Sequence, residues 1–181
     1  MPGVVGEKIV LGSGTLYCME FTGELPTDVL IEVEENRLGY IQGGASIEYK
    51  PEFYTAEDDM GKVVKVIMTK EEATLKSGVL TWCGDTLKKI CSTARVTELA
   101  GVRTVKIGGV ANNDGKKYVI HFVHEDVIDG DIRITIVGQN QAGFTLAFAK
   151  NKETVIDAAF KAQPHDTEGT LILYTEEIPT V

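Results

Sequence analysis

Apolar and polar side chains alternate with a period of two in several short runs of the second half of the chain. The alternating runs are residues 103–107, 132–136 and 144–149, and residues 117–124, 155–161 and 169–175 are further expected strands. A period of two places successive side chains on opposite faces of a strand. Clusters of Asn, Asp and Gly, such as residues 112–115, separate the runs and favour tight turns. The pattern predicts short antiparallel strands rather than alternating strands and helices.

One segment has a helical period instead. In residues 85–94, the apolar positions fall at i, i+3, i+4 and i+7, and they are Leu87, Ile90, Cys91 and Ala94. This spacing puts them on one face of a helix, and Asp85 suits its N-cap. We therefore expect a mainly β protein, an antiparallel sandwich or barrel flanked by one short α-helix.

The first half is less regular, with expected strands at residues 15–21, 39–49 and 72–82. Residues 50–71 lie between the last two and carry both charged and apolar side chains. Connections this long in a compact domain are usually functional, so we expect a projecting loop or hairpin. Residues 1–14, rich in glycine, are expected to form a flexible arm. The whole chain, 1–181, is expected to be a single domain.

Composition agrees with a globular protein, with 43% apolar and 25% charged residues among 181. No apolar run approaches the length of a membrane span, and the first residues do not resemble a signal peptide. Three cysteines without a CxxC motif favour a reducing compartment. These features lead us to expect a soluble, cytoplasmic domain.

The net charge of −9 comes from one part of the chain. Residues 1–60 hold 12 acidic and 3 basic side chains, whereas residues 61–181 hold 15 of each. An acidic excess disfavours binding to a phosphate backbone and suits either solubility or a surface that repels nucleic acid.

No motif predicts catalysis, a metal site or a cofactor. His121 and His124 are three residues apart, and on a strand they would point to opposite faces. The glycine-rich residues 12–15 lack the full phosphate-loop spacing. Cys91 lies on the apolar face of the expected helix, where thiols are usually inert. We therefore expect a protein that is not an enzyme.

Several longer stretches together resemble the major tail protein, or tail tube protein, of long-tailed bacteriophages of Gram-positive bacteria. These stretches are residues 39–54, 71–82, 85–94 and 138–148. The likeness extends over nearly the whole chain and lies in overall similarity and element order rather than in a short signature.

The resemblance implies a β-sandwich with one helix, six copies of which form a ring. Rings would stack into a tube through which DNA passes during ejection, without sequence-specific binding. The implied partners are further copies of the chain and the tape-measure, tail-tip and tail-terminator proteins, with no membrane. The protein would be assembled in the bacterial host cytoplasm and located in the virion tail.

Within this hypothesis, two groups of residues are candidates for function. The segment between the strands would bridge rings through Glu57, Asp58, Asp59, Lys62 and Lys65. An acidic lumen would carry Glu32, Glu34 and Glu48. Two alternatives stay open: a tube subunit of a phage-tail-like bacteriocin or secretion system, and a β-sandwich carbohydrate-binding module.

Overall fold

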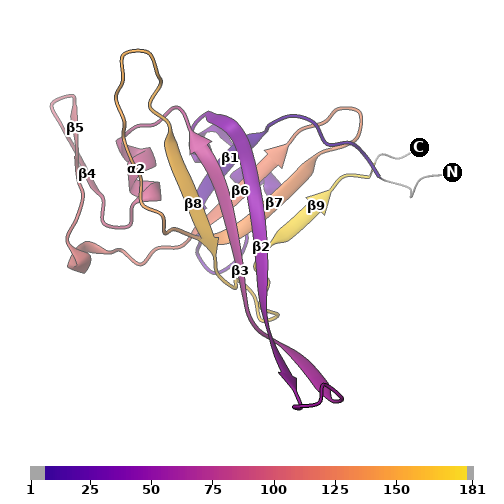
Figure 1. Ribbon diagram of the computed structural model, residues 1–181. Coiled ribbons are helices and arrows are strands. Elements are labelled where there is room, and N and C mark those ends of the chain that lie inside the picture. Colours follow the sequence, from indigo (N-terminus) through magenta and orange to yellow (C-terminus); the bar gives the residue numbers. More distant parts are fainter. Residues whose placement is uncertain (1–6, 179–181) are drawn as a thin grey trace.

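Antiparallel strands in two layers form the body of the protein, which is mainly β with few helices (Figure 1). The computed structural model describes residues 7–178. Its elements are β1 (Thr15–Glu20), α1 (Asp28–Ile31), η1 (Glu34–Asn36), β2 (Ile41–Glu57), β3 (Val64–Val79), α2 (Gly84–Ile90), β4 (Arg95–Leu99), β5 (Val102–Lys106), η2 (Val110–Asn112), β6 (Tyr118–His124), β7 (Ile132–Asn140), β8 (Ile156–Ala162) and β9 (Leu173–Glu176). The expected fold class, a β-sandwich with a short helix, is confirmed.

The main sheet runs in the order β1-β6-β7-β8-β3-β2, and β9 pairs with the start of β7. Strand β7 joins the two layers, because it pairs with β6 along most of its length and with β8 only at residues 138–140. Gly138 stands at this corner. A Cβ atom there would lie 2.0 Å from the carbonyl oxygen of Lys161, so only glycine fits.

The main core lies between the two layers. Leu16, Ile120 and Ile136 point inward from β1, β6 and β7, and Leu75 and Phe160 meet them from β3 and β8. Helix α2 covers one side of this core. A second, smaller apolar cluster lies on the opposite face of the β1-β6-β7 layer, beneath α1. The layer β8-β3-β2 is therefore the one whose outer face carries no such cover.

Two local expectations from the sequence need correction. The helix spans Gly84–Ile90 rather than residues 85–94, and Cys83 instead of Asp85 occupies its N-cap, where its N–H donates to Thr86 Oγ1 over 3.2 Å. Residues 144–149 form a loop and not a strand. Phe144 and Leu146 still pack against the core. The alternation of side chains in this segment therefore results from burial of one side of the loop and not from pairing with a strand.

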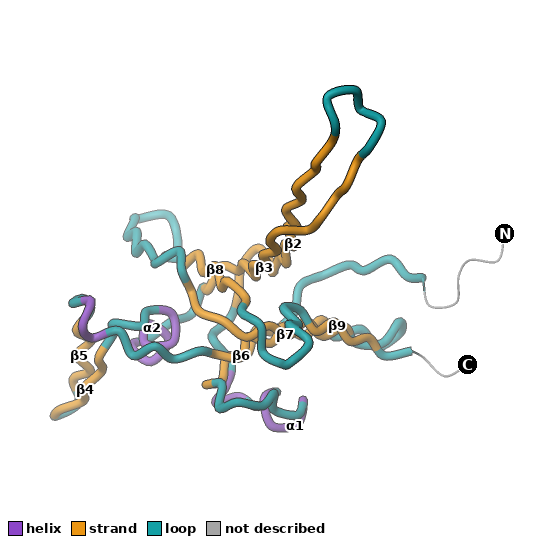
Figure 2. The backbone as a smooth tube through the Cα atoms, turned by 90° about the horizontal axis from the view of Figure 1, so that it is seen from below, coloured by secondary structure: helices purple, strands orange, loops and turns teal. Residues whose placement is uncertain are grey.

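The β2-β3 hairpin projects far from the body (Figure 2). Strand β2 pairs with β3 almost continuously, from Ile41 opposite Val79 to Glu57 opposite Val64. Strand β3 also pairs with β8, but only over residues 74–79. The expected loop 50–71 is therefore a two-stranded ribbon with an irregular tip at residues 58–63. In the described residues, no third strand pairs with this part of the hairpin. We call residues 50–71 the ribbon.

The N-terminal arm is described only in part. Residues 7–14 contain no helix or strand, and residues 1–6 of the expected arm lie outside the described residues. Lys8 Nζ donates to the carbonyl oxygens of Asp129 and Gly130, and His124 Nδ1 donates to that of Ser13. Within residues 7–178, no helix is long and apolar enough to span a membrane.

Candidate assembly surfaces

The ribbon exposes an unusual number of apolar side chains for a segment without a core of its own. All residues from 49 to 71 are exposed. The large apolar side chains among them are Phe53, Tyr54, Met60, Val63, Val64, Val66, Ile67 and Met68. A two-stranded ribbon alone is only marginally stable in water. Contiguous exposed apolar surface of this kind marks an interaction site.

A register shift at Glu52 and Phe53 separates the ribbon's outer half from its base. Beyond this bulge, Phe53 lies opposite Met68 and Thr55 opposite Val66, so these side chains share one face. Tyr54 and Ile67, which are also paired, lie on the other face. The ribbon therefore offers apolar contacts on both of its faces.

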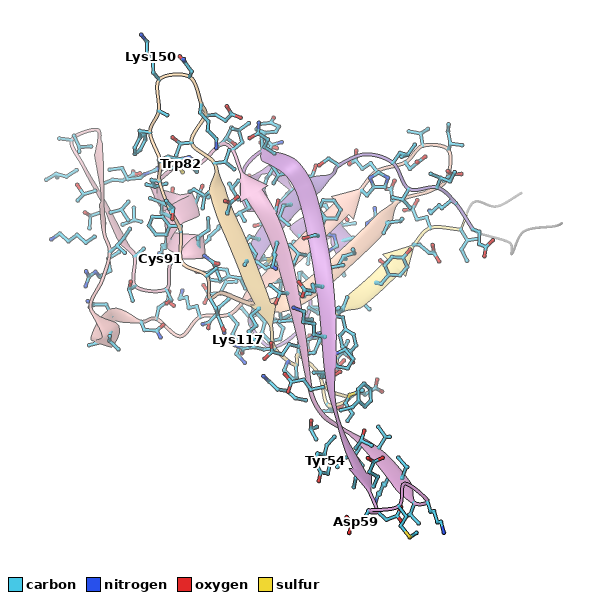
Figure 3. All side chains as sticks on the ribbon, viewed as in Figure 1. Tyr54, Asp59, Trp82, Cys91, Lys117 and Lys150 are labelled. Atoms are coloured by element: carbon cyan, nitrogen blue, oxygen red, sulfur yellow. The ribbon has the colours of Figure 1, made fainter. Side chains whose placement is uncertain are left out.

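The five charged residues expected to bridge rings lie at or near the tip of this ribbon. Asp58 Oδ1 accepts hydrogen bonds from the N–H groups of Lys62 and Val63, which closes the turn and lowers the pKa of that carboxyl. Among the described residues, Glu57, Asp59, Lys62 and Lys65 form no ion pair, so their charges are free for an external partner. Figure 3 shows Asp59 at the tip, far from Lys150 at the opposite end of the molecule.

The edge of the sheet formed by β2 is open. In the described part of the chain, β2 pairs only with β3, and its other side carries unpaired backbone groups along its length. Strand β9 likewise pairs only with β7. Open edges are templates for pairing with another chain. The fold thus offers edges at which a second copy could extend the sheet.

The outer face of the β8-β3-β2 layer is covered with alternating charges. Because Ile47, Leu75 and Phe160 point into the core, the neighbouring positions on each strand point outward. Eight of these outward positions are charged: Glu48, Lys50, Glu52, Lys70, Glu72, Lys76, Asp157 and Lys161. Sequence reasoning singled out only Glu48 on this face, although the spacing of two in Glu48, Lys50 and Glu52 was a usable signal.

Most charges on this face are paired across the strands. Glu48 contacts Lys50 on its own strand and Lys76 on β3, the latter over 3.3 Å. Glu72 contacts Lys70, and also Lys161 on β8 over 2.9 Å. The two lysines around Glu72 lower its pKa to about 2, and those around Glu48 lower its pKa below the ordinary value. Glu72 therefore stays charged well into the acid range.

Glu32 lies in a different ionic network, on the outer side of the other layer. His121 is buried on β6 and donates from Nε2 to Glu32 Oε1 over 3.0 Å, and its Nδ1 lies 2.8 Å from the Thr135 hydroxyl oxygen, with which it shares a hydrogen bond. Arg133 Nε donates to the same Glu32 oxygen over 2.6 Å. Burial would raise the pKa of Glu32, but the hydrogen bonds from Arg133 and His121 outweigh it and lower that pKa.

This network is the best arrangement of metal-ligand types in the described residues. Asp28, Glu32 and His121 each place one ligand atom within 4.8 Å of the others. However, Arg133 Nε also lies 3.6 Å from Asp28 Oδ2, so its guanidinium already occupies the place where a cation would balance the carboxylates. The residues fit an ion-pair network better than a metal centre.

The three expected lumen acids do not share a surface. Glu32 is the C-cap of α1 and Glu34 belongs to η1; both elements cover the β1-β6-β7 layer, and Glu34 pairs with Arg37. Glu48 lies on the outer face of the opposite layer and is paired with two lysines. The three side chains therefore lie on two different surfaces of the subunit, and their place in a lumen stays a prediction.

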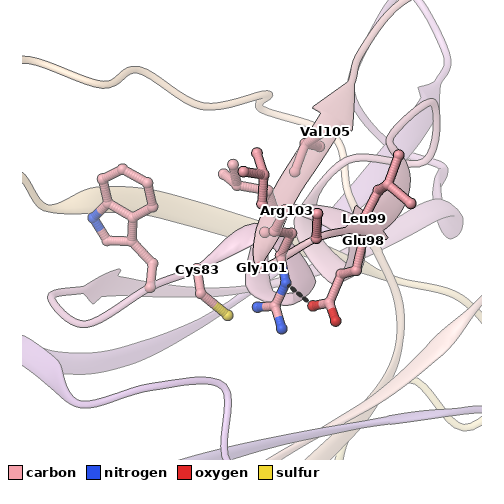
Figure 4. A pocket seen from close by; sticks show the side chains of 11 residues that line it. Cys83, Glu98, Leu99, Gly101, Arg103 and Val105 are labelled. Carbon is pink, nitrogen blue, oxygen red and sulfur yellow. Dashed lines mark hydrogen bonds and ion pairs between the residues drawn. The ribbon is translucent and has the colours of Figure 1, made fainter.

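A shallow hollow of about 640 Å³ lies between the start of α2 and the β4-β5 hairpin (Figure 4). Trp82 is its one aromatic lining residue, and its indole Nε1 donates to the Thr154 carbonyl oxygen over 3.2 Å. The Arg103 guanidinium in the wall is paired with Glu98 and Asp85. A single half-buried ring gives little surface on which a sugar could stack.

Among the described residues, the cysteines and His121 do not form a nucleophilic site. Cys18 is fully buried, and burial raises the pKa of its thiol to about 12, so it is inert. Cys83 is exposed and contacts Thr86, whereas both ring nitrogens of His121 form hydrogen bonds.

A comparison of the chain with protein-family models and with curated proteins finds no match. The proposed function therefore rests on the ribbon and on the open sheet edges.

Proposed function

We propose that this chain is the structural subunit of a phage tail tube, which self-assembles into stacked hexameric rings around a channel for DNA. The observation that carries the proposal is the ribbon. It extends from the body with exposed apolar side chains and unpaired charges, a combination that needs a partner surface. The sequence resemblance to major tail proteins supports the same conclusion.

The positions of the interaction features suit a head-to-tail assembly. The ribbon tip and the loop that contains Lys150 mark opposite ends of the molecule (Figure 3). A contact between unlike ends of identical subunits is heterologous, and where its rotation does not close a ring, repetition of the contact builds a stack. The ribbon of one ring would contact the next ring, with Glu57, Asp59, Lys62 and Lys65 forming ion pairs across the boundary.

Within a ring, neighbouring copies would join through sheet edges. The edge of β2 is open along the strand, and closing several sheets into one barrel removes such edges altogether. The proposed partners are further copies of the chain, together with tape-measure, tail-tip and tail-terminator proteins. The assembled tube would belong to the virion and form in the host cytoplasm.

Electron microscopy of the purified protein over a concentration series tests this proposal. Rings or hollow tubes with a central channel are expected, because the ribbon and the β2 edge act between identical copies. A protein that stays monomeric at every concentration, including under crowding with polyethylene glycol, would contradict it. Solid fibres without a channel would also contradict it.

The same images would not separate a phage tail from a tube that carries no DNA. The nature of the genes beside this one makes that distinction: capsid and DNA-packaging genes are expected for a phage. Toxin or secretion genes in their place would favour the bacteriocin-like or secretion alternative.

A further inference from the structure

Of the two layers, only one can provide a channel lining. The outer face of β1-β6-β7 carries α1 and the apolar cluster beneath it. The outer face of β8-β3-β2 is open, and its β2 edge is free to continue into a neighbouring copy. If copies join edge to edge, the β8-β3-β2 faces form one continuous surface.

This outer face is electrically neutral although the chain has a net charge of −9. Its charged positions are four carboxylates and four ammonium groups, which balance when Lys50, Glu52 and Lys70 at the base of the ribbon are counted with the face. The acidic excess lies elsewhere, for example in the α1 and η1 region. A lining of this composition cannot repel DNA through net negative charge.

A net charge of zero would not by itself prevent the lysines of this face from contacting DNA phosphates. The positions of the carboxylates beside these lysines hinder such contacts. Glu72 lies between Lys70 and Lys161, and Glu48 lies between Lys50 and Lys76. Each of the two carboxylates thus contacts the ammonium groups of two lysines, one on its own strand and one on a neighbouring strand. A phosphate would have to compete with these neighbouring carboxylates for the lysines, and so the release of counterions that drives DNA binding is reduced.

We propose that the β8-β3-β2 outer face is a non-adhesive channel lining for double-stranded DNA, in which Glu48 and Glu72 mask four lysines. This inference rests on the proposed function. It replaces repulsion by an acidic wall with a charge-balanced surface. The masking carboxylates are the residues that determine whether the face binds DNA.

The double variant Glu48→Gln and Glu72→Gln tests the inference in the unassembled chain, where this face is open to solvent. Both side chains are at the surface, and circular dichroism verifies the fold. Binding is measured by fluorescence anisotropy with a labelled double-stranded DNA oligonucleotide at low salt. The double variant should bind at least about tenfold more tightly than the unmodified protein. Its affinity should fall with salt, with a slope of up to about −3.6 for four phosphate contacts.

A matched control removes the same charge elsewhere. Glu20→Gln with Glu98→Gln removes the partner of Lys116 and one of the two carboxylates paired with Arg103, all outside this face. The control should not gain DNA binding. Adding Lys50→Gln and Lys76→Gln to the double variant should remove most of the binding gained.

Equal binding by the double variant and the control would overturn the inference, because net charge alone would then explain the effect. Electron microscopy of the same preparations keeps the two proposals apart. Rings combined with unchanged DNA binding would overturn the masked lining and leave the tube intact. A failure of all preparations to form rings would overturn the proposed function, and the channel placement with it.

Discussion

Replacing residues 51–71 with an Asn-Gly turn should abolish tube formation and leave the body folded. The new turn would join Lys50 to Glu72, which are directly paired in the register. Asn-Gly is the preferred sequence for a two-residue hairpin turn. The ion pairs of Glu48 and of Glu72 with Lys161 would remain in place.

The expected change in stability follows from the structure. No residue between 49 and 71 is buried, so the excision removes no core contact. Shortening the connection from 21 residues to two lowers the entropy lost on closing it, by at most about 2 kcal/mol. The pairing lost with a two-stranded ribbon is close to neutral. The free energy of unfolding should therefore stay the same or rise by up to about 2 kcal/mol.

Urea denaturation measures this free energy, and electron microscopy measures tube length. The control carries Val127→Ser and Ile128→Ser, which change apolar side chains that are also exposed but lie outside the ribbon. It should form tubes of normal length. A loss of more than about 2 kcal/mol would show that the ribbon belongs to the cooperative fold. Normal tubes without the ribbon would refute its role in assembly.

Three other outcomes are expected. The pKa of Glu72 is lowered in the folded state from 4.5 to about 2, so its stabilising effect is complete above about pH 4.5 and is lost as the pH falls towards 2. In the Glu72→Gln variant, the melting temperature should therefore depend less on pH across this window. An unchanged dependence on pH would argue against the ion pairs of Glu72 with Lys70 and Lys161. Arg133→Gln leaves Glu32 half-buried without its guanidinium and should cost about 2 to 3 kcal/mol, below the value for a fully buried pair, as measured by urea denaturation; no loss would indicate that the network is dispensable. Phe160→Ala should cost about 3 to 5 kcal/mol because the ring is fully buried, whereas Phe148→Ala, at 77% exposure, should cost far less; similar losses would contradict the assigned core.

The alternation of residues was sufficient to predict most strands of the sheet. The run 132–136 carries large apolar side chains at every second position, whereas the run 117–124 is mostly apolar because β6 is buried on both faces. The helix was also predictable, because Leu87 and Ile90 must share the buried face, although it ends at Ile90 and does not include Ala94. The loop 144–149 was not, since Phe144 and Leu146 alternate for burial while no neighbouring strand pairs with them.

For the candidate surfaces, the sequence identified the segment and not its form. Residues 50–71 stood out by length and charge, but only the register of β2 with β3 showed that they form a ribbon. The expected lumen acids do not lie together, because closeness in the sequence does not determine the layer in which a side chain lies. Glu32 and Glu48 are close in the chain and lie on opposite sides of the sandwich.

The sequence by itself determined the β-rich class, the short helix and the regional excess of acid, because these depend on local periodicity and on counts. Tertiary structure decided which charges meet. Lys161 reaches Glu72 although 89 residues separate them, because β8 pairs with β3. The neutral face therefore exists only after the strands are placed side by side, and no local pattern in the chain encodes it.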